Sequence, residues 1–582
     1  MFKLKSSFVL LNIALLSACT SNGGSFDVQS VKVESNKPDS PKPSLQDDNS
    51  SARRTINNTE ATALLQPGFG FSAKIPRRNQ LPQANENAAP IGEITPIAGD
   101  LTKIPYEEEV KAYGYDDEGF SHTHDGHNGH NTRDFKFVRS GYVLHSGAKP
   151  EIKHKEVLRT GAHGYVYYLG THPAKAMPAQ KAIYKGYWDF TTDARKDRDS
   201  QYFSNSAGVN IGATPENSRD VNLDDAEKPM GHTGEFTADF SNKTLTGTLV
   251  RNGYVKPRTN EQKITPLYDI NATIQGNRFS GKANARNTED PYFGKDSSTL
   301  EGGFFGDNTQ ELAGKFLADD KSIFVVFAGK RDAQENDSER AFDALKVSLK
   351  DLSKSEMDTF GNATHLLINN TQIPLIAEGK KSFAEMKFDD LVMPTVGGKT
   401  YRISVCCNNL DYVKFGTYSE ENDKDSSHLY LVGERTAVAD LPSGKAQYRG
   451  TWNGIMRSEA GSAGAESPSN SESGTRSLFD VDFANKKING KLIANDGVEE
   501  RPMLTLEGEI KANGFAGTAK TSDSGFNLDP KSTWGGTVIH VDSQFEGAFY
   551  GKNALELGGI VHDSNSKDKV SITFAGKRQI AK

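Results

Sequence analysis

The stretch KAIYKGYWDF, residues 181–190, returns later in the chain as KAQYRGTWNG, residues 445–454. In both copies Lys-Ala is followed, at the same spacing, by an aromatic residue, a basic residue, glycine and tryptophan. The chain contains only 3 Trp, and two of them, Trp188 and Trp452, occupy the same position in this phrase. Such agreement predicts an internal duplication, with the shared tryptophan filling the interior of each copy.

The phrases that follow each copy recur in the same order, which chance matches would not do. We therefore expect two homologous halves, with their boundary near 332–341. Weaker matches upstream extend both halves toward their amino ends. The matched stretches are 236–249 with 479–492, 277–283 with 513–519, 300–314 with 545–559, 327–331 with 574–578, and upstream 137–143 with 412–418 and 167–170 with 430–433.

Short runs that alternate apolar and polar residues, such as 321–330 and 570–577, are separated by Gly, Asn and Asp. This pattern is typical of antiparallel strands, so we predict an all-β fold. A closed barrel of about eight strands fits each downstream repeat and removes exposed edges, and a packed sandwich is the alternative. Helical periodicity is weak, with one candidate helix at 339–358.

The bulk composition excludes several classes of protein. A chain of 582 residues is too long for one core. The net charge of −7 argues against a nucleic-acid partner. No catalytic motif is complete, since AGSAG (460–464) lacks the first glycine of a nucleophile elbow and MPTVGGKT has Met393 where a phosphate-binding loop needs glycine. We predict that the protein is not an enzyme and uses no cofactor.

The amino terminus reads as an export signal. Lys3 and Lys5 precede the apolar run 8–16, which is too short to span a bilayer. The next residues, LSAC, resemble a bacterial lipobox, which predicts a diacylglycerol and an N-acyl chain on Cys19. The alternative is an ordinary signal peptide cut near Ala18. The stretch 20–51 is rich in Ser, Asn, Pro and Asp and is predicted to be a flexible tether.

Two further features have open interpretations. Cys406 and Cys407 are adjacent, and they form either a vicinal disulfide or two buried thiols. Four histidines lie within the stretch 121–130, where imidazoles could bind Zn²⁺ or Ni²⁺, although a polar glycine-rich loop is the simpler explanation. We predict no metal site, with these residues as weak candidates: His122, His124, His127 and His130.

The lipobox, the tether, the doubled series GxW…DFxNKxxxGxL…FxGxA…EGxFxG…FAGKR and the segment VCCNNLDYVKFG (405–416) together resemble the transferrin-binding protein B family. The resemblance implies two lobes, each with a β-rich handle and an eight-stranded antiparallel barrel. Placed on this sequence, the parts are a signal peptide (1–18), a lipid-anchored tether (19–51), an N-lobe handle (52–178) and barrel (179–332), and a C-lobe handle (341–441) and barrel (442–582).

The same resemblance implies a surface lipoprotein anchored in the outer membrane. It implies capture of host iron-loaded transferrin by the N-terminal lobe and delivery to a TonB-dependent channel, transferrin-binding protein A. A lactoferrin-binding relative is the alternative within the family, but the long acidic runs expected for it are missing here. A host-protein adhesin or immune-evasion lipoprotein is the alternative outside it.

Binding a protein requires exposed aromatic residues, and the N-terminal half is rich in them before its barrel. Tyr115 and Phe120 lie among carboxylates that resist burial. Tyr165 and Tyr168 lie in GYVYYLG, where strand alternation places them on opposite faces. We predict these four as contacts with transferrin. The C-terminal counterpart, 426–433, lacks the tyrosine run, which favours binding by the N-terminal lobe.

Overall fold

The computed structural model describes residues 45–581, except for 52–69, 82–87, 117, 124–132, 134, 175–176, 179–180, 196–230, 254, 257, 332–339, 360–362, 370, 387–389, 459–460, 465–474, 496–499 and 529–535. The chain divides into two compact units. The N unit is Gln66–Asp337, and the C unit is Ser338–Lys582 together with Met1–Leu65. The predicted signal peptide, Cys19 and most of the predicted tether lie outside the described residues. Among those described, no helix is long and apolar enough to cross a membrane.

The N unit contains a closed antiparallel barrel of eight strands, in which β10 pairs with both β12 and β18. The sequence therefore predicted the barrel correctly, and the alternative sandwich is wrong. The strands are β10 (Lys181–Thr192), β12 (Gly231–Asp239), β13 (Thr244–Asn252), β14 (Ile264–Gln275), β15 (Arg278–Ala285), β16 (Ser297–Phe305), β17 (Glu311–Leu317) and β18 (Ile323–Lys330).

The C unit repeats this barrel, and pairing between its first and last strands, from Gln447↔Gln579 to Arg457↔Lys569, closes it. The short β28 (Gly461–Gly464) pairs with the first strand. The eight strands are β27 (Lys445–Ser458), β29 (Arg476–Asp482), β30 (Lys487–Asn495), β31 (Glu500–Lys511), β32 (Gly514–Lys520), β35 (Asp542–Tyr550), β36 (Glu556–Asp563) and β37 (Lys569–Ala581).

The two tryptophans that revealed the duplication occupy equivalent interior positions. Both side chains are buried, and the indole N–H of Trp188 donates to the carbonyl of Val250 at 3.0 Å while that of Trp452 donates to Ile493 at 3.0 Å. Each acceptor lies at a register shift, between β13 and β14 or between β30 and β31. A bulge interrupts the ladder of backbone hydrogen bonds, so the indole supplies a partner to a carbonyl at that interruption.

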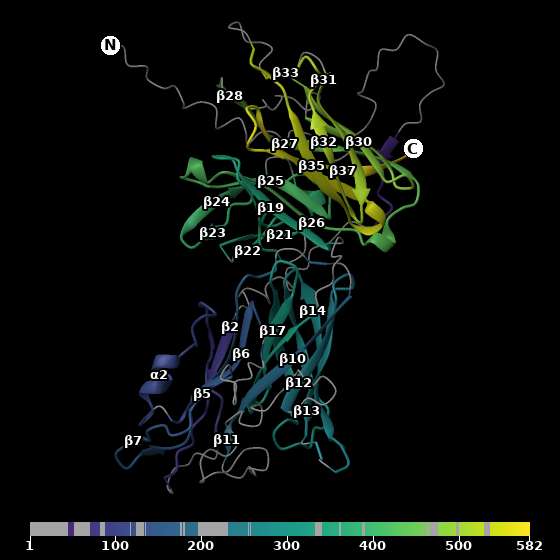
Figure 1. Cartoon of the computed structure of the whole chain (residues 1–582). Helices are drawn as coiled ribbons and strands as arrows, with labels where there is room; N and C mark the ends of the chain where they lie inside the picture. The colour runs from purple at the N-terminus through teal and green to yellow at the C-terminus, as the bar shows by residue number, and fades with distance from the viewer. Residues whose placement is uncertain are drawn as a thin grey trace, which may run out of the picture. The chain divides into compact units, whose positions relative to one another are not determined.

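Each barrel carries a handle sheet beside it (Figure 1). The N handle has the strand order β4-β2-β9-β6-β5, and the C handle has the order β20-β19-β26-β25-β24-β23. The N-handle elements are β2 (Gly70–Lys74), β4 (Ile94–Pro96), α2 (Glu107–Ala112), β5 (Phe120–His122), β6 (Val138–His145) and β9 (His163–Gly170), with the small pairs β3 (Ala88–Ala89)–β11 (Ala194–Arg195) and β7 (Glu151–Lys153)–β8 (Val157–Arg159).

The C handle contains β19 (Phe342–Ser348), β20 (Lys354–Glu356), β23 (Thr395–Val396), β24 (Lys399–Ile403), β25 (Val413–Glu420) and β26 (His428–Glu434), with the hairpin β21 (His365–Ile368)–β22 (Thr371–Pro374). Short pieces complete the C unit: η5 (Phe383–Glu385), η6 (Lys424–Ser426), η7 (Val438–Asp440), β33 (Phe526–Asn527), β34 (Val538–Ile539) and η8 (Lys552–Ala554).

A buried glutamate fastens handle to barrel in the same way in both units. At the start of β17, the carboxylate of Glu311 accepts from the backbone N–H of Lys136 at 2.6 Å and of Phe137 at 2.8 Å. Its counterpart at the start of β36, Glu556, accepts at 2.7, 2.9 and 3.0 Å from the N–H groups of Asp411, Tyr412 and Val413. These bonds give buried carboxylate partners to backbone donors at or just before the start of β6 and β25.

Two sequence expectations are corrected by the structure. The predicted helix at 339–358 is instead β19 and β20, because residues 342–348 pair with β26. Buried Ala344 and Val347 contribute to two different core clusters. Tertiary pairing thus overrides a weak helical pattern. The predicted tether extends to residue 51, but Leu45–Asp47 form β1, which pairs with the end of β37.

Candidate protein-binding surface on the N handle

A short helix covers one face of the N-handle sheet. The side chain of Val110 in α2 is fully buried and packs with Val143 and Tyr167. The first turn of α2 consists of Glu107, Glu108 and Glu109. Carboxylates are favoured there because the backbone N–H groups of a first turn are unpaired and carry partial positive charge. Burial of Val110 therefore fixes a helix whose acidic end is turned to solvent.

Two aromatic stacks join α2 to β9. The rings of Tyr106 and Tyr165 are stacked with centroids 3.8 Å apart, and the Tyr165 hydroxyl donates to Glu109 at 2.8 Å. The rings of Tyr113 and His163 are stacked at 3.7 Å. Because His163 and Tyr165 lie two residues apart in β9, their side chains share the face that α2 covers.

The protonation state of His163 follows from this packing. Burial, with repulsion from Lys74, lowers the pKa of His163 to about 4, although Glu109 at 3.3 Å opposes the shift. The imidazole is therefore neutral at neutral pH. Burial and the adjacent Glu109 carboxylate also raise the pKa of Tyr165, so its hydroxyl keeps its proton and remains a donor.

The loop that follows α2 carries the most exposed aromatic residue of this surface. The ring nitrogen Nε2 of His145 contacts the carbonyl of Asp116 at 2.6 Å, and the imidazole lies against Gly114 and Gly119. A Cβ atom at Gly114 would lie 2.0 Å from this ring, so only glycine lets the loop approach so closely. The loop is thereby held over His145, and Tyr115 projects from it with 71% of its surface exposed.

The structure separates the four predicted contacts. Tyr115 is exposed, whereas Phe120 and Tyr165 are half-buried at the edge of the same surface. Lys111 lies over the Phe120 ring, with its Nζ 4.8 Å from the ring centroid. Tyr168 is fully buried among residues of β2 and the outer faces of β16–β18, so its prediction as a surface contact is wrong.

Sequence alternation correctly placed Tyr165 and Tyr168 on opposite faces, but it did not show that the barrel covers one of those faces. It also missed His145, His163 and Glu109, which position the exposed aromatics. His163 could have been found, because it shares the period of two with Tyr165 and Tyr167 in β9. His145 and Glu109 carry no comparable local signal.

Of the four weak metal candidates, His122 lies in β5 with its ring 5.8 Å from that of Phe120. The other three, His124, His127 and His130, lie outside the described residues. Within the part of the chain that the structure describes, no group of three or more His, Cys, Asp or Glu side chains is arranged to hold a metal ion.

The corresponding face of the C handle has different residues. His428, the counterpart of Tyr165, stacks on Tyr418 with ring centroids 4.9 Å apart. The position of His163 is taken by Ser426, whose hydroxyl accepts from the backbone N–H of Glu420 at 2.8 Å. The C unit thus repeats the scaffold but has neither the Tyr106–Tyr165 stack nor the Tyr113–His163 stack.

Two handle-and-barrel units in one chain, one of them bearing an aromatic and acidic surface, define a bilobed protein suited to binding another protein. Family models match nearly the whole chain: the C-lobe and N-lobe barrels of transferrin-binding protein B at 177–331 and 441–578, its C-lobe handle at 339–436 and its N-lobe handle at 44–174. The chain belongs to the transferrin-binding protein B family.

Individual relatives agree with this assignment. A transferrin-binding protein B of Neisseria meningitidis serogroup B is 36% identical over 609 residues, which covers 98% of each chain. One from Haemophilus influenzae is 33% identical over 636 residues and 97% of each chain. The solved structure of a Haemophilus parasuis transferrin-binding protein B mutant has a TM-score of 0.71 at 31% identity, covering 92% of this chain and 100% of the other. The isotype 1 protein of serogroup B N. meningitidis has a TM-score of 0.68 at 34% identity, covering 88% and 99%.

Proposed function

We propose that the protein captures host iron-loaded transferrin on the surface formed by α2, the residues that follow it up to Phe120, and Tyr165 of β9. The observation that supports this most directly is the exposure of Tyr115, just after the acidic helix α2, on a scaffold shared with relatives named transferrin-binding protein B. Tyrosine side chains supply large contact areas at low entropic cost, and they dominate protein interfaces.

The geometry favours a preorganised surface. Tyr106, Tyr113 and Tyr165 are held by ring stacking or by hydrogen bonds, so little side-chain freedom remains to be lost on binding. Preference for the iron-loaded form would arise from a transferrin surface that exists only when the iron-binding lobe is closed. Differential affinity for two conformations is what such selection requires, and no iron ligand from this protein is needed.

We further propose the remaining steps of the pathway. Acylation of Cys19 with a diacylglycerol and an N-acyl chain anchors the protein in the outer membrane, exposed at the cell surface. Bound transferrin is then passed to the TonB-dependent channel transferrin-binding protein A. In this scheme the protein acts by binding alone, without catalysis and without a cofactor.

The test is a binding measurement on the full chain with iron-loaded and iron-free transferrins from several hosts, immobilised at equal density. We expect tighter binding to the iron-loaded form of at least one host's transferrin. Iron-loaded lactoferrin serves as the comparison ligand. Equal binding to both forms of every transferrin, or preferential binding of lactoferrin, would overturn the proposal.

A further inference from the structure

The segment that precedes the N unit in sequence is seated on the C unit. Leu45, Gln46 and Asp47 of β1 pair with Ala581, Ile580 and Gln579 at the end of β37. The paired strand β36 reaches β37 only as far as Glu556↔Lys577, so β1 extends the sheet where β36 has ended. The backbone N–H of Asp48 continues this pairing by donating to the carbonyl of Arg578 at 2.8 Å.

Two consecutive carboxylates hold the segment in place. Asp47 is 4% exposed, and it accepts from the side-chain amides of Asn409 at 3.0 Å and Gln579 at 2.8 Å. Asp48 is 3% exposed, and one of its oxygens accepts from Nε of Arg578 at 2.9 Å and from Nη2 at 2.6 Å. A buried carboxylate without a hydrogen-bond partner is energetically costly. Asp47 and Asp48 therefore favour a site that offers amide donors to the first and a guanidinium group to the second.

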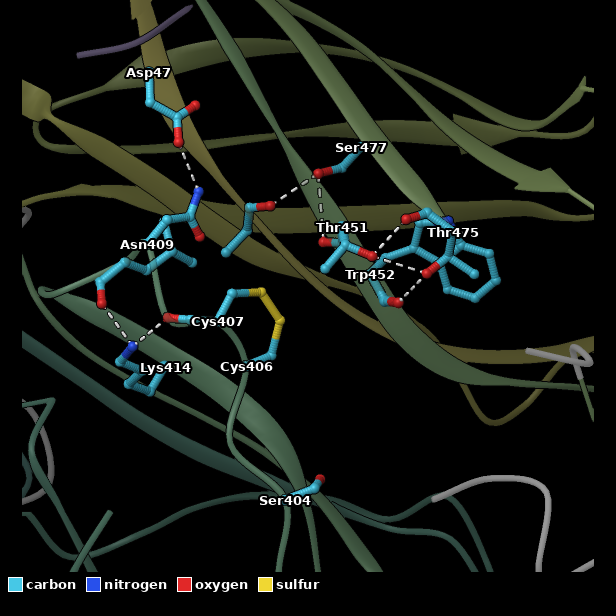
Figure 2. The surroundings of a disulfide bond; sticks show 12 residues. Asp47, Ser404, Cys406, Cys407, Asn409, Lys414, Thr451, Trp452, Thr475 and Ser477 are labelled. Atoms are coloured by element: carbon cyan, nitrogen blue, oxygen red, sulfur yellow. Dashed lines mark hydrogen bonds between the residues drawn. A yellow bond between two sulfur atoms is a disulfide. The ribbon is translucent and has the colours of Figure 1, made fainter. Parts of the chain in front are cut away.

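The receiving loop of the C handle is itself rigidly supported (Figure 2). Nζ of the buried Lys414 donates to the carbonyls of Cys407 at 2.5 Å and Leu410 at 2.6 Å. Lys577 donates to the carbonyl of Asn409 at 2.8 Å. Cys406 and Cys407 form a disulfide across a cis peptide, which resolves the alternative left open by the sequence. The Asn409 amide is thus presented to Asp47 from a loop fixed on both sides.

Docking of β1 changes how the chain is connected. If β1 were not docked, the first described element along the chain would be β2 at Gly70, which belongs to the N unit. With β1 docked, a chain coming from Cys19 meets the C unit first, at Leu45, and only then continues to Gly70. The stretch 52–69 becomes a second covalent connection between the units, in addition to 332–339.

We propose that residues 45–50 are a latch, and that the C unit carries a strand-addition site specific for an extended segment with two adjacent carboxylates. The latch transfers the attachment of the lipid-bearing chain from the N unit to the C unit. Only this membrane consequence rests on the proposed function, through acylation of Cys19. Backbone pairing gives such sites their affinity, and the side-chain sites for Asp47 and Asp48 give the specificity.

The test introduces Gln46→Cys and Ile580→Cys, at two residues that are paired across β1 and β37, in the full-length protein. These two side chains face each other across the β1–β37 pairing, and Ile580 is 40% exposed. Under mild oxidation we expect a cross-link, detected by mass spectrometry of the peptides. Adding Asp47→Asn and Asp48→Asn should slow its formation at least tenfold, because amide groups would then face the donors of Asn409, Gln579 and Arg578.

The matched control is the pair Glu507→Gln and Asp523→Asn, which removes the same charge from exposed positions of the C unit. It should leave the cross-linking rate unchanged. Equal slowing by both pairs, or no cross-link in the parent cysteine protein, would overturn the latch. Transferrin binding is measured on the same samples. A cross-linking result that overturns the latch, with transferrin binding intact, contradicts this inference alone. Absence of transferrin binding with a normal cross-link contradicts only the proposed function.

Discussion

The N unit and the C unit agree where handle meets barrel and differ on the far face of the handle. Both have an interior tryptophan bonded to a bulge carbonyl, and both have a glutamate that binds the start of a handle strand. Only the N handle covers its outer face with α2 and the two aromatic stacks. The duplicated contacts therefore maintain the scaffold, and the residues that differ are the ones free to serve binding.

The barrel interiors also differ in one respect. In the N unit, His232 is buried, with its ring 4.5 Å from that of Trp188 and 5.3 Å from that of Phe190. In the C unit the equivalent position is Thr475, whose hydroxyl donates to the carbonyl of Trp452 at 2.9 Å. The same fold thus accommodates an ionisable group in one barrel and a hydroxyl in the other, which gives the two units different responses to acid.

The largest effect is expected from the shared tryptophans. Trp188→Ala should lower the free energy of unfolding of the N unit by about 3–5 kcal/mol, and Trp452→Ala should do the same for the C unit, because each leaves a cavity and an unpaired carbonyl. Hydrogen exchange of β12–β14 and of β29–β31 reports the two units separately. Equal loss of protection in both units from one substitution would contradict the duplication of independent cores.

The handle–barrel glutamates should give the next largest effect. Glu311→Gln or Glu556→Gln places an amide NH₂ against backbone donors, which should destabilise the attachment of that handle by about 2–3 kcal/mol. The measurement is hydrogen exchange at β6 for the first variant and at β25 for the second. Glu301→Gln is a control in the N unit, since its partner Lys315 is a side chain and not the handle backbone. An equal change at β6 in this control would contradict the assigned role.

Acid should destabilise the N unit more than the C unit. Burial lowers the pKa of His232 to about 3, so the folded state keeps it neutral while the unfolded chain takes up a proton below about pH 6.5. The N unit has its full stability above that pH and loses stability progressively as the pH falls toward 3. The loss is about 2 kcal/mol at pH 5. Hydrogen exchange at pH 7 and pH 5, corrected for intrinsic rates, measures it.

The variant His232→Leu should reduce this pH-dependent difference between the units. Part should remain, because the pKa of His163 is also lowered, to about 4, in the N handle. If the difference were unchanged in His232→Leu, the ionisation of His232 would not be its cause.

The smallest expected change in free energy concerns the proposed contact. Tyr115→Ala should weaken transferrin binding about tenfold, or about 1.4 kcal/mol, and leave the unfolding of the N unit unchanged because Tyr115 is exposed. Met393→Ala is the matched control, since Met393 is an exposed apolar side chain of the C handle. Titration calorimetry measures both. A comparable loss from the control, or none from Tyr115→Ala, would argue against an N-handle contact.

The duplicated phrases predicted both barrels and the interior tryptophans, because repeated local patterns directly encode repeated strands. Contacts between residues that are far apart in the sequence leave no such local pattern. Alternation in β9 shows that Tyr165 and Tyr168 point to opposite sides, but the covering of those sides by α2 and by the barrel is decided by distant residues. The pairing of β1 is similar, since 530 residues separate Asp48 from Arg578 and nothing local in LQDD indicates a strand partner.

The bonding of the tryptophans has a spectroscopic consequence. The chain has only 3 Trp, and Trp188 and Trp452 are each buried in the interior of one barrel. Intrinsic fluorescence therefore contains one built-in reporter for each barrel. Replacing both Trp452 and Trp534 by Phe leaves Trp188 as the one tryptophan of the sequence, so that the red shift accompanying denaturation reports on the N barrel. Replacing Trp188 and Trp534 instead makes Trp452 the reporter of the C barrel, without any attached dye.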